Sequence, residues 1–381
     1  MDDNRRILAL DSGGCWTKLG IAGEENPDYT IRTTLGISDN GNTSNRETFI
    51  GVPEKMSDMT SLVSPIERGV IHEWDAMEQI WDYLFYTKME TDPETWQLTT
   101  VEPLLNPRYQ IETKAQIFFE KYNFPSLCVT DEGTQTLLGH CISSALCMCI
   151  GDGTTTISAI CDTFRVPSAT QKLEIGGSDI TMYLQSLICK RGYSFTSPGE
   201  LETLREIKEK HCYALEVPIA EQDADWRVSA QNKSLISLPG GDVMPMGAEK
   251  WKCAELLFDP TLAGSHCPGL HHAIKKCLDH VPVNMRKTLV ERIVCTGGTT
   301  HMSGLSERLV HEMKDTYPNC VPKVRVKPEE DLNYIGLSIV GSLYNCNDRF
   351  VSKAEYEEFG PSYVRNRHSL YTYTCTQDQL E

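Results

Sequence analysis

The sequence has 381 residues, with 36 lysines and arginines against 53 aspartates and glutamates, so its formal net charge is −17. Such an acidic surface repels nucleic-acid phosphates and anionic lipid headgroups, so we expect no direct binding to nucleic acid or membrane. The composition, 40% hydrophobic and 23% charged, is that of a globular protein, and the length suits two cores. The cysteines lack the paired spacing of a zinc site, and we expect reduced, packed thiols.

The first predicted element is a β-hairpin at 7–21, ILALDSGGCWTKLGI, where two apolar runs flank a glycine turn. The segment 37–46 is polar and rich in turn residues, which predicts an exposed loop. At 73–89, large apolar residues recur every three or four positions, which predicts an amphipathic helix with a buried aromatic face.

A second hairpin is predicted at 145–160, ALCMCIGDGTTTISAI, and it repeats the pattern of the first. The two hairpins align as Asp11 over Cys149, Gly13 over Gly151, Gly14 over Asp152 and Cys15 over Gly153. Backbone N–H groups at such turns form a concave anion site, and glycine leaves room for a phosphate. The echo therefore predicts two related α/β halves that close around a phosphate ligand.

A helix is expected at 199–212, after the start signal Ser197-Pro198, and its charged residues face solvent by default. The stretch 216–242 mixes Pro, Asp, Asn and Gly and predicts a second peripheral excursion. A third glycine turn, TGGTT at 296–300, follows an apolar run and precedes a helical segment. Strand, glycine turn and helix in this order are typical of a nucleotide contact.

Long segments of the chain together resemble the actin family. The segments are DSGGCWTKLGIAGEENP (11–27), GVIHEWDAMEQIWDYLF (69–85), EPLLNPR (102–108), RGYSFTS (191–197), REIKEKHCY (205–213), TGGTT (296–300) and VSKAEYEEFGPSYV (351–364). The resemblance implies the actin-like ATPase fold, in which two duplicated α/β domains with mixed five-stranded sheets enclose a cleft that holds ATP and a divalent cation, Mg²⁺ or Ca²⁺. By that resemblance, one half comprises 1–139 and 334–368 with a small subdomain at about 33–69. The other comprises 140–333 with a subdomain at about 176–262, and 369–381 is an extension.

The resemblance also implies roles for single residues. Contacts to the β- and γ-phosphates fall on Gly13, Gly14, Cys15 and Lys18, and the opposing clamp falls on Gly151, Asp152 and Gly153, with Asp152 near the ribose. The base and sugar are lined by Arg205, Lys208 and Glu209, and the adenosine is approached by Gly297, Gly298 and Thr299. Asp11 holds the metal through water.

The chain departs from the family at several of these positions. Cys149 stands where the family has a carboxylate that helps to hold the hydrated metal, and a neutral thiol is no substitute because Mg²⁺ prefers hard oxygen ligands. Glu132 replaces the water-positioning glutamine and is the one candidate general base, and Thr156 replaces a neighbouring histidine. A family lysine falls near Glu330 or Asp331. These changes predict slow ATP hydrolysis or none.

Three functions fit these observations to different degrees. The leading expectation is a divergent actin-related protein that binds ATP as a structural ligand within a multi-subunit cytoskeletal or chromatin assembly, with other proteins or actin-family subunits as partners. The second is a filament-forming ATPase, although the polar loop at 37–46 and the small plug at 262–265 argue against strong self-association. The third is a sugar kinase or chaperone ATPase, but the sequence shows no separate set of substrate-binding residues for such an activity. The N-terminus lacks a signal peptide, so a cytoplasmic, cytoskeletal location is expected, with the nucleus as the alternative.

Overall fold

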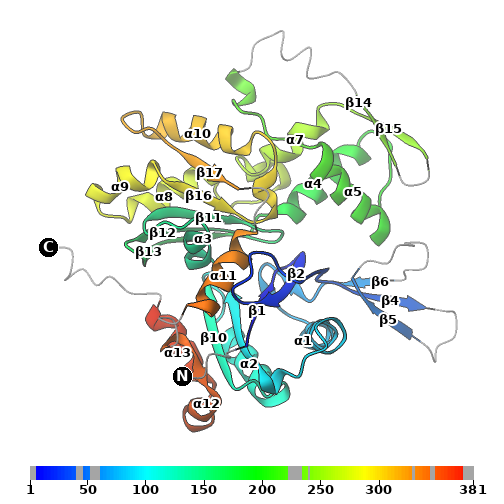
Figure 1. Ribbon diagram of the computed structural model, residues 1–381. Coiled ribbons are helices and arrows are strands. Elements are labelled where there is room, and N and C mark those ends of the chain that lie inside the picture. Colours follow the sequence, from blue (N-terminus) through cyan, green and yellow to red (C-terminus); the bar gives the residue numbers. More distant parts are fainter. Residues whose placement is uncertain are drawn as a thin grey trace.

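The computed structural model describes residues 6–39, 46–51, 61–221, 234–238, 241–327, 331–343 and 348–371. Two sheets, each flanked by helices, form the two halves of this part of the chain (Figure 1), and the predicted α/β class is confirmed. The first sheet has the strand order β18 (Val351–Ser352), β10 (Ser126–Asp131), β9 (Gln97–Glu102), β1 (Ile7–Ser12), β2 (Trp16–Ile21) and β3 (Tyr29–Arg32). The second has the order β13 (Phe164–Leu173), β12 (Thr155–Cys161), β11 (Ala145–Ile150), β16 (Ile293–Thr296) and β17 (Val324–Val326).

The two sheets share one topology. In the first, β10, β9 and β1 are parallel while β2 and β3 continue antiparallel, and in the second β17, β16 and β11 are parallel while β12 and β13 continue antiparallel. The internal echo in the sequence thus corresponds to a repeat of five strands in the same order and direction. The first sheet has one strand more than expected, because the two-residue β18 pairs with the outer edge of β10.

Both predicted hairpins are present. β1 pairs with β2 so that Asp11 lies opposite Lys18, and β11 pairs with β12 so that Cys149 lies opposite Thr156. All six residues of β11 are buried, in accord with its unbroken apolar run, because this central strand is covered on both faces.

The helices of the first half surround an aromatic core. They are α1 (Trp74–Asp82), the π-helical turn η2 (Tyr83–Lys88), the 3₁₀ turn η3 (Pro93–Thr95), α2 (Tyr109–Gln116), the π-helical turn η4 (Ile117–Lys121), α12 (Lys353–Phe359) and α13 (Pro361–Tyr371). The helix predicted at 73–89 is confirmed in extent, but its last six helical residues form the wider turn η2. There Phe85 packs edge-on against Tyr122 and Phe124, next to the contact of Trp81 with Phe118.

Two helices lie between the sheets (Figure 1), α3 (Glu132–Gly139) and α11 (Leu332–Ser342). On α3, Leu137 packs against Cys147 and Val294 of the second sheet, whereas α11 packs against β1 and β9 of the first. The two helices approach so closely that a Cβ atom on Gly336 would lie 2.2 Å from the carbonyl oxygen of Gln135. Glycine at this position therefore determines how the halves are joined.

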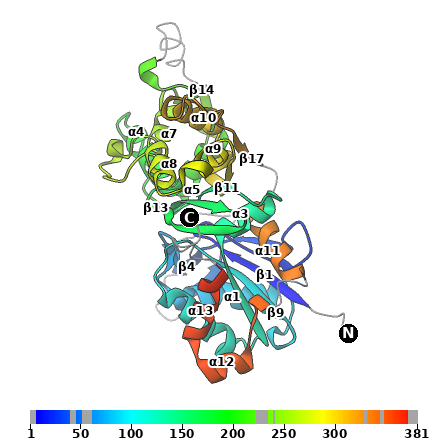
Figure 2. The ribbon, with the colours of Figure 1, turned by 90° about the vertical axis from the view of Figure 1, so that its left-hand side faces the viewer.

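The helices of the second half lie around its own apolar core, and Figure 2 shows this half stacked above the first. They are α4 (Gly177–Cys189), α5 (Pro198–His211), η5 (Ile219–Glu221), α7 (Glu249–Glu255), η6 (Pro260–Ala263), α8 (Leu270–Asp279), α9 (Val283–Val290), η7 (Gly298–His301) and α10 (Leu305–Thr316). The helix predicted at 199–212 is confirmed to within one residue, and Ser197 and Glu200 form a capping box at its start. No helix in the described ranges is both long and apolar enough to span a membrane.

Small sheets form the periphery. They are β4 (Leu35–Asp39) with β5 (Arg46–Ile50) and β6 (Ser61–Val63), β7 (Ile66–Glu67) with β8 (Val70–Ile71), and β14 (Ser234–Ser237) with β15 (Val243–Met246). The loop predicted at 37–46 is thus partly strand, because both of its ends pair in a hairpin, and 40–45 lies outside the described residues. So do 222–233 and 239–240 of the predicted excursion. Helix α13 continues to Tyr371 and 372–381 is not among the described residues, so the extension predicted at 369–381 stays a prediction.

Candidate functional site

The two glycine turns between the halves are closed by the same hydrogen bond. In the first hairpin Gly13 N–H donates to the carbonyl oxygen of Trp16 at 2.9 Å, and in the second Gly151 N–H donates to that of Thr154 at 2.9 Å. The two turns thus match in local geometry as well as in sequence. A Cβ atom on Gly14 would lie 3.9 Å from the carbonyl oxygen of Ile66, an ordinary contact distance, so this position has room for a side-chain atom.

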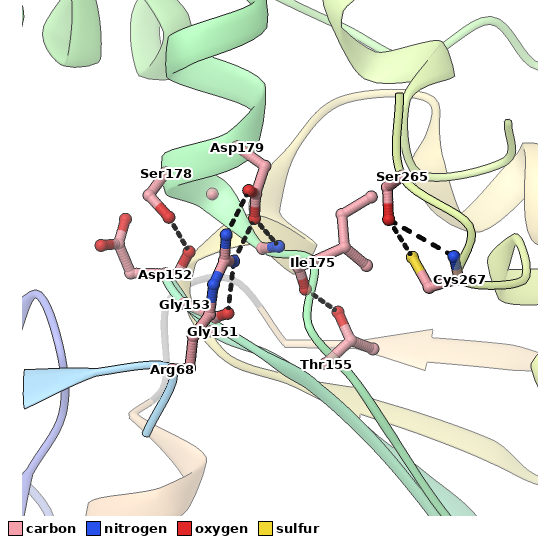
Figure 3. Close-up of polar contacts among 12 residues, drawn as sticks. Arg68, Gly151, Asp152, Gly153, Thr155, Ile175, Ser178, Asp179, Ser265 and Cys267 are labelled. Atoms are coloured by element: carbon pink, nitrogen blue, oxygen red, sulfur yellow. Dashed lines mark hydrogen bonds and ion pairs between the residues drawn. The ribbon is translucent and has the colours of Figure 1, made fainter. Parts of the chain in front are cut away.

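The second turn is held by the N-terminus of α4. Ser178 donates its hydroxyl to the carbonyl oxygen of Asp152 at 2.8 Å (Figure 3). Its backbone N–H donates to the same oxygen at 2.8 Å, and Gly177 N–H donates to the carbonyl oxygen of Gly151 at 3.0 Å. A Cβ atom on Gly176 would lie 2.4 Å from the carbonyl oxygen of Asp152. Glycines 176 and 177 are therefore needed for this close contact of helix and turn.

The third turn joins the same space. Thr299 donates its hydroxyl to the carbonyl oxygen of Gly151 at 3.0 Å. Gly297 has φ +91° and a Cβ atom there would lie 2.4 Å from the carbonyl oxygen of Ile150, whereas a Cβ atom on Gly298 would meet nothing within 4 Å. Glycine at 297 thus allows the backbone to make this turn, whereas Gly298 has open space where a side chain would lie.

The α5 residues differ in their surroundings. Lys208 was expected by default on a solvated face but is only 6% exposed, because α4 and the second turn cover it. Its ammonium group donates to the carbonyl oxygen of Gly177 at 2.9 Å, and burial lowers its pKa. Arg205 is half-buried and lies 2.8 Å from the Cys15 sulfur and 3.5 Å from the Asp152 carboxylate. Glu209 is exposed, and its charge acts on Lys208 and Cys15.

A charged triad lies beside the first hairpin. The Lys18 ammonium forms an ion pair with Asp331 of the chain just before α11. Burial raises the pKa of Asp11 to about 6, and although Lys18 opposes this shift, Asp331 adds to it. Burial works against the charge of Lys18, but Asp11 and Asp331 together raise its pKa. Lys18 therefore already has a carboxylate partner within the chain. Glu330, the other position aligned with the family lysine, lies outside the described residues.

The candidate base Glu132 is buried and already bonded. Burial raises its pKa, while its carboxylate accepts hydrogen bonds from the Thr156 hydroxyl, from the Leu104 N–H at 3.3 Å and from the Cys149 thiol. The Cys149 thiol is buried as well, so its pKa lies well above the ordinary value. Glu132, Thr156 and Cys149 are thus brought together as a hydrogen-bonded cluster at the base of the second hairpin.

These groups do not fit a hydrated divalent cation. Such a cation needs carboxylates free to orient its waters, but Cys149 is a protonated thiol and Glu132 is occupied by hydrogen-bond donors. Asp11 and Asp331 remain, and both carboxylates face the ammonium of Lys18. By contrast, the three glycine turns and Lys208 fit an anionic ligand, since they offer backbone N–H groups, open space at Gly298 and a buried cation.

Four charged residues that the sequence analysis did not single out also lie at the junction of the halves. Arg68 donates to both carboxylate oxygens of Asp179, at 2.6 and 2.7 Å, and to the carbonyl oxygen of Gly153 at 2.9 Å (Figure 3). Arg32 pairs with Glu202. The partners in each pair lie 111 and 170 positions apart in the chain. No local pattern connects residues so distant, so only the tertiary structure reveals the pairs.

A groove of about 580 Å³ opens on the other side of the Arg68–Asp179 pair. Its lining includes Lys172, Ile175, Leu256 and Cys267 but no residue of the three glycine turns. Figure 3 shows Ser265 and Cys267 on that side, where the Ser265 hydroxyl donates to the Cys267 sulfur at 3.2 Å. This groove is therefore separate from the space between the hairpins.

Two topologically equivalent α/β sheets, joined by two helices and facing each other through matched glycine hairpins, define the actin-like class of fold. The family model described as Actin matches residues 2–369, and the chain belongs to the actin family. Among its relatives, actin-related protein 2 of Schizosaccharomyces pombe is 30% identical over 377 residues, covering 93% of this chain and 96% of that protein. Actin-like protein 7A of Bos taurus is 30% identical over 368 residues, covering 95% of this chain and 83% of that protein, and that of Rattus norvegicus is 31% identical with the same coverage.

Proposed function

We propose that this divergent actin-related protein binds ATP between its halves, hydrolyses it slowly or not at all, and acts as a structural or regulatory subunit of a larger cytoskeletal or chromatin assembly. The observation that carries the proposal is the convergence of the three glycine turns. A Cβ atom on Gly177 would lie within 3.3 Å of Thr299, Lys208 and Asp152 at once, so the second and third turns share one small space with Lys208. Arg205 links the first turn to it, since it lies 2.8 Å from the Cys15 sulfur and 3.5 Å from the Asp152 carboxylate. That arrangement suits a ligand with a sugar and phosphates.

In this proposal the two matched turns contact the phosphates from opposite sides. The first contributes Gly13, Gly14, Cys15 and Lys18, and the second contributes Gly151, Asp152 and Gly153. On the nucleoside side, Arg205, Lys208 and Glu209 face Gly297, Gly298 and Thr299. Lys18 would have to exchange its bond to Asp331 for a phosphate oxygen, which lowers the expected affinity because the phosphate competes with a carboxylate.

Slow hydrolysis is expected because the candidate base is not free. A general base must accept a proton from the attacking water, yet Glu132 already accepts hydrogen bonds from Thr156, Leu104 and Cys149. The Mg²⁺ or Ca²⁺ that the family implies lacks a suitable set of ligands here. We therefore assign no step to a metal ion, and bound ATP is expected to persist.

The wider setting remains part of the proposal. The division into 1–139 with 334–368 and 140–333 stays a prediction, and so do the protein partners and a cytoplasmic, cytoskeletal or nuclear location. The filament-forming ATPase stays the alternative, since the segment 351–364 that resembles the family folds as β18, α12 and the start of α13.

The test is the identity of the nucleotide that the purified full chain retains after incubation with Mg-ATP and removal of free ligand. Intact ATP at about one equivalent supports the proposal, and a parallel incubation in EDTA shows whether the metal matters. ADP with released phosphate would overturn the hydrolysis part and make Glu132→Gln the first variant to assay. No retained nucleotide and no measurable affinity would overturn the binding part.

A further inference from the structure

Two arginine pairs join the halves of the molecule directly. Arg32 ends β3 of the first sheet, and its partner Glu202 lies on α5 of the second half. Only 10% and 15% of the two side chains are exposed, so this pair is largely shielded from water. A shielded pair is much less screened by salt than a surface pair.

The Cys15 thiol strengthens the same junction. It accepts hydrogen bonds from Arg32 of its own half and from Arg205 of the other half. Arg205 also lies 3.5 Å from Glu202, so the two arginines, the glutamate and the thiol form one continuous network across the junction of the halves. The Arg32 guanidinium lies 4.7 Å from the centre of the Trp16 ring, which further fixes its position.

The second pair lies at the turn between β7 and β8 and is more exposed than the first, with 35% of the Arg68 side chain and 23% of the Asp179 side chain exposed. Arg68 has φ +49°, a conformation that a long side chain rarely adopts, and it is held there by three charge-assisted hydrogen bonds to the second half. Asp179 also accepts the Gly176 N–H at 2.8 Å, so the pair ties the first half to the N-terminus of α4 and to the second glycine turn (Figure 3). Nearby, Lys172 donates to Asn106 of the first half at 2.6 Å.

We propose that these two pairs, Arg32–Glu202 and Arg68–Asp179, form a clamp that keeps the halves closed without a bound nucleotide. A phosphate chain between two glycine turns would draw the halves together by accepting hydrogen bonds from both. In the clamp, two carboxylates of the second half instead accept hydrogen bonds from two guanidinium groups of the first half, and so hold the halves together. This inference goes beyond the proposed function, because it concerns the protein without ligand.

The main effect of the clamp is to favour the closed position of the two halves over open ones. A shielded ion pair gains little net stability over an apolar pair of the same shape, but removing one partner leaves an uncompensated charge that opening to water relieves. This applies most strongly to Arg32–Glu202, because the Arg68–Asp179 pair is more exposed. Opening is therefore unfavourable while both pairs are intact, and each broken pair favours it. The bidentate geometry of Arg68 and Asp179 adds directional specificity.

The experiment uses the full chain stripped of nucleotide with EDTA and an ATP-degrading enzyme, studied by small-angle X-ray scattering and thermal unfolding. The stripped wild-type protein is expected to scatter as the closed structure does. The variant with both Arg32→Gln and Arg68→Gln is expected to show a larger radius of gyration and a Tm lower by about 5 °C. The control Glu206→Gln breaks the exposed Lys210–Glu206 pair within α5 and should change neither quantity.

A double-mutant cycle on Arg32 and Glu202 covers the case in which the double arginine variant fails to fold. The single changes Arg32→Gln and Glu202→Gln should each lower the Tm, and together they should lower it by less than the sum, because the second change removes the charge that the first left unpaired. Expanded scattering by stripped wild-type protein would overturn the proposal, as would additive effects in the cycle. Neither outcome depends on whether ATP binds.

Discussion

At the scale of single residues, Asp11 shows how burial beside other charged groups changes the pKa of a carboxyl group. It lies opposite Lys18 in the first hairpin, and burial raises its pKa from 3.8 to about 6. The folded protein thus holds a proton at Asp11 more tightly than the unfolded chain does. Stability from this group is present below pH 4 and is lost as the pH rises through about 6.

The variant Asp11→Asn tests this expectation. Asparagine never ionises, so the variant should gain stability relative to the wild type as the pH rises from 4 to 7, by about 2 kcal/mol once the partial exposure of Asp11 is allowed for. The measurement is urea unfolding of both proteins at pH 4.5 and 7.5. Asp75→Asn on the exposed face of α1 is the control, and an Asp11 variant that behaves like it at both pH values would contradict the prediction.

The candidate residues were only partly predictable from the sequence. The glycine turns can be predicted from the sequence, because neighbouring residues specify a turn between two apolar runs. The structure brings the three turns to the junction of the two halves. The burial of Lys208 carries no such signal, since its position on α5 reads as solvent-facing until α4 is packed over it. The same holds for Arg68, whose partner Asp179 is 111 positions away.

At the scale of elements, the third glycine turn contains two neighbouring glycines with different reasons to be glycine. Gly297 has φ +91° and no room for a Cβ atom, whereas Gly298 has room and faces open space. The fold requires glycine at 297. At 298 the requirement is expected to come from the ligand, because nothing in the described chain fills the space in front of Gly298.

Alanine at each position separates the two reasons. Gly297→Ala should lower the free energy of unfolding by about 3 kcal/mol, because its Cβ atom meets the Ile150 carbonyl in an unfavourable backbone conformation. Gly298→Ala should leave stability within about 0.5 kcal/mol and weaken ATP binding at least tenfold. Urea unfolding and calorimetric titration with ATP are the two measurements. Equal ATP affinity of Gly298→Ala and wild type would argue against this part of the site.

The sequence pattern also does not predict where an α-helix changes to a π-helical turn. The periodicity at 73–89 predicts a helix but not its change to a π-helical turn at Tyr83. A second wide turn, η4, lies where α2 ends, and the rings of Phe85, Phe118 and Tyr122 meet between the two. Wide turns accommodate these large rings, and that need arises only when the two helices pack.

At the scale of the whole molecule, self-association is the property that separates the proposed function from its alternative. Leu262, in the segment that resembles the family's apolar plug, is 45% exposed, and its helix η6 ends at a left-handed Gly264. One exposed leucine offers little apolar area to a neighbouring subunit, and stable association depends on such area.

We therefore expect the purified chain to stay in the supernatant after ultracentrifugation in Mg-ATP and salt at concentrations of about 10 µM, a range in which specific interfaces of μM affinity would associate. A conventional actin under the same conditions serves as the positive control for pelleting. A pellet of ordered filaments would favour the filament-forming alternative. A matched Leu262→Ser variant would then show whether this residue makes the contact.

The sequence by itself determined the α/β class, the two hairpins, the main helices and the family, because these depend on periodicity, turn residues and long motifs within short stretches of chain. The tertiary structure alone decided that Lys18 pairs with Asp331, that Glu132 is enclosed by Thr156 and Cys149, and that arginine pairs connect the halves. Charges interact through space over a few ångströms regardless of their separation in the chain. Their partners are therefore set by how the two halves pack.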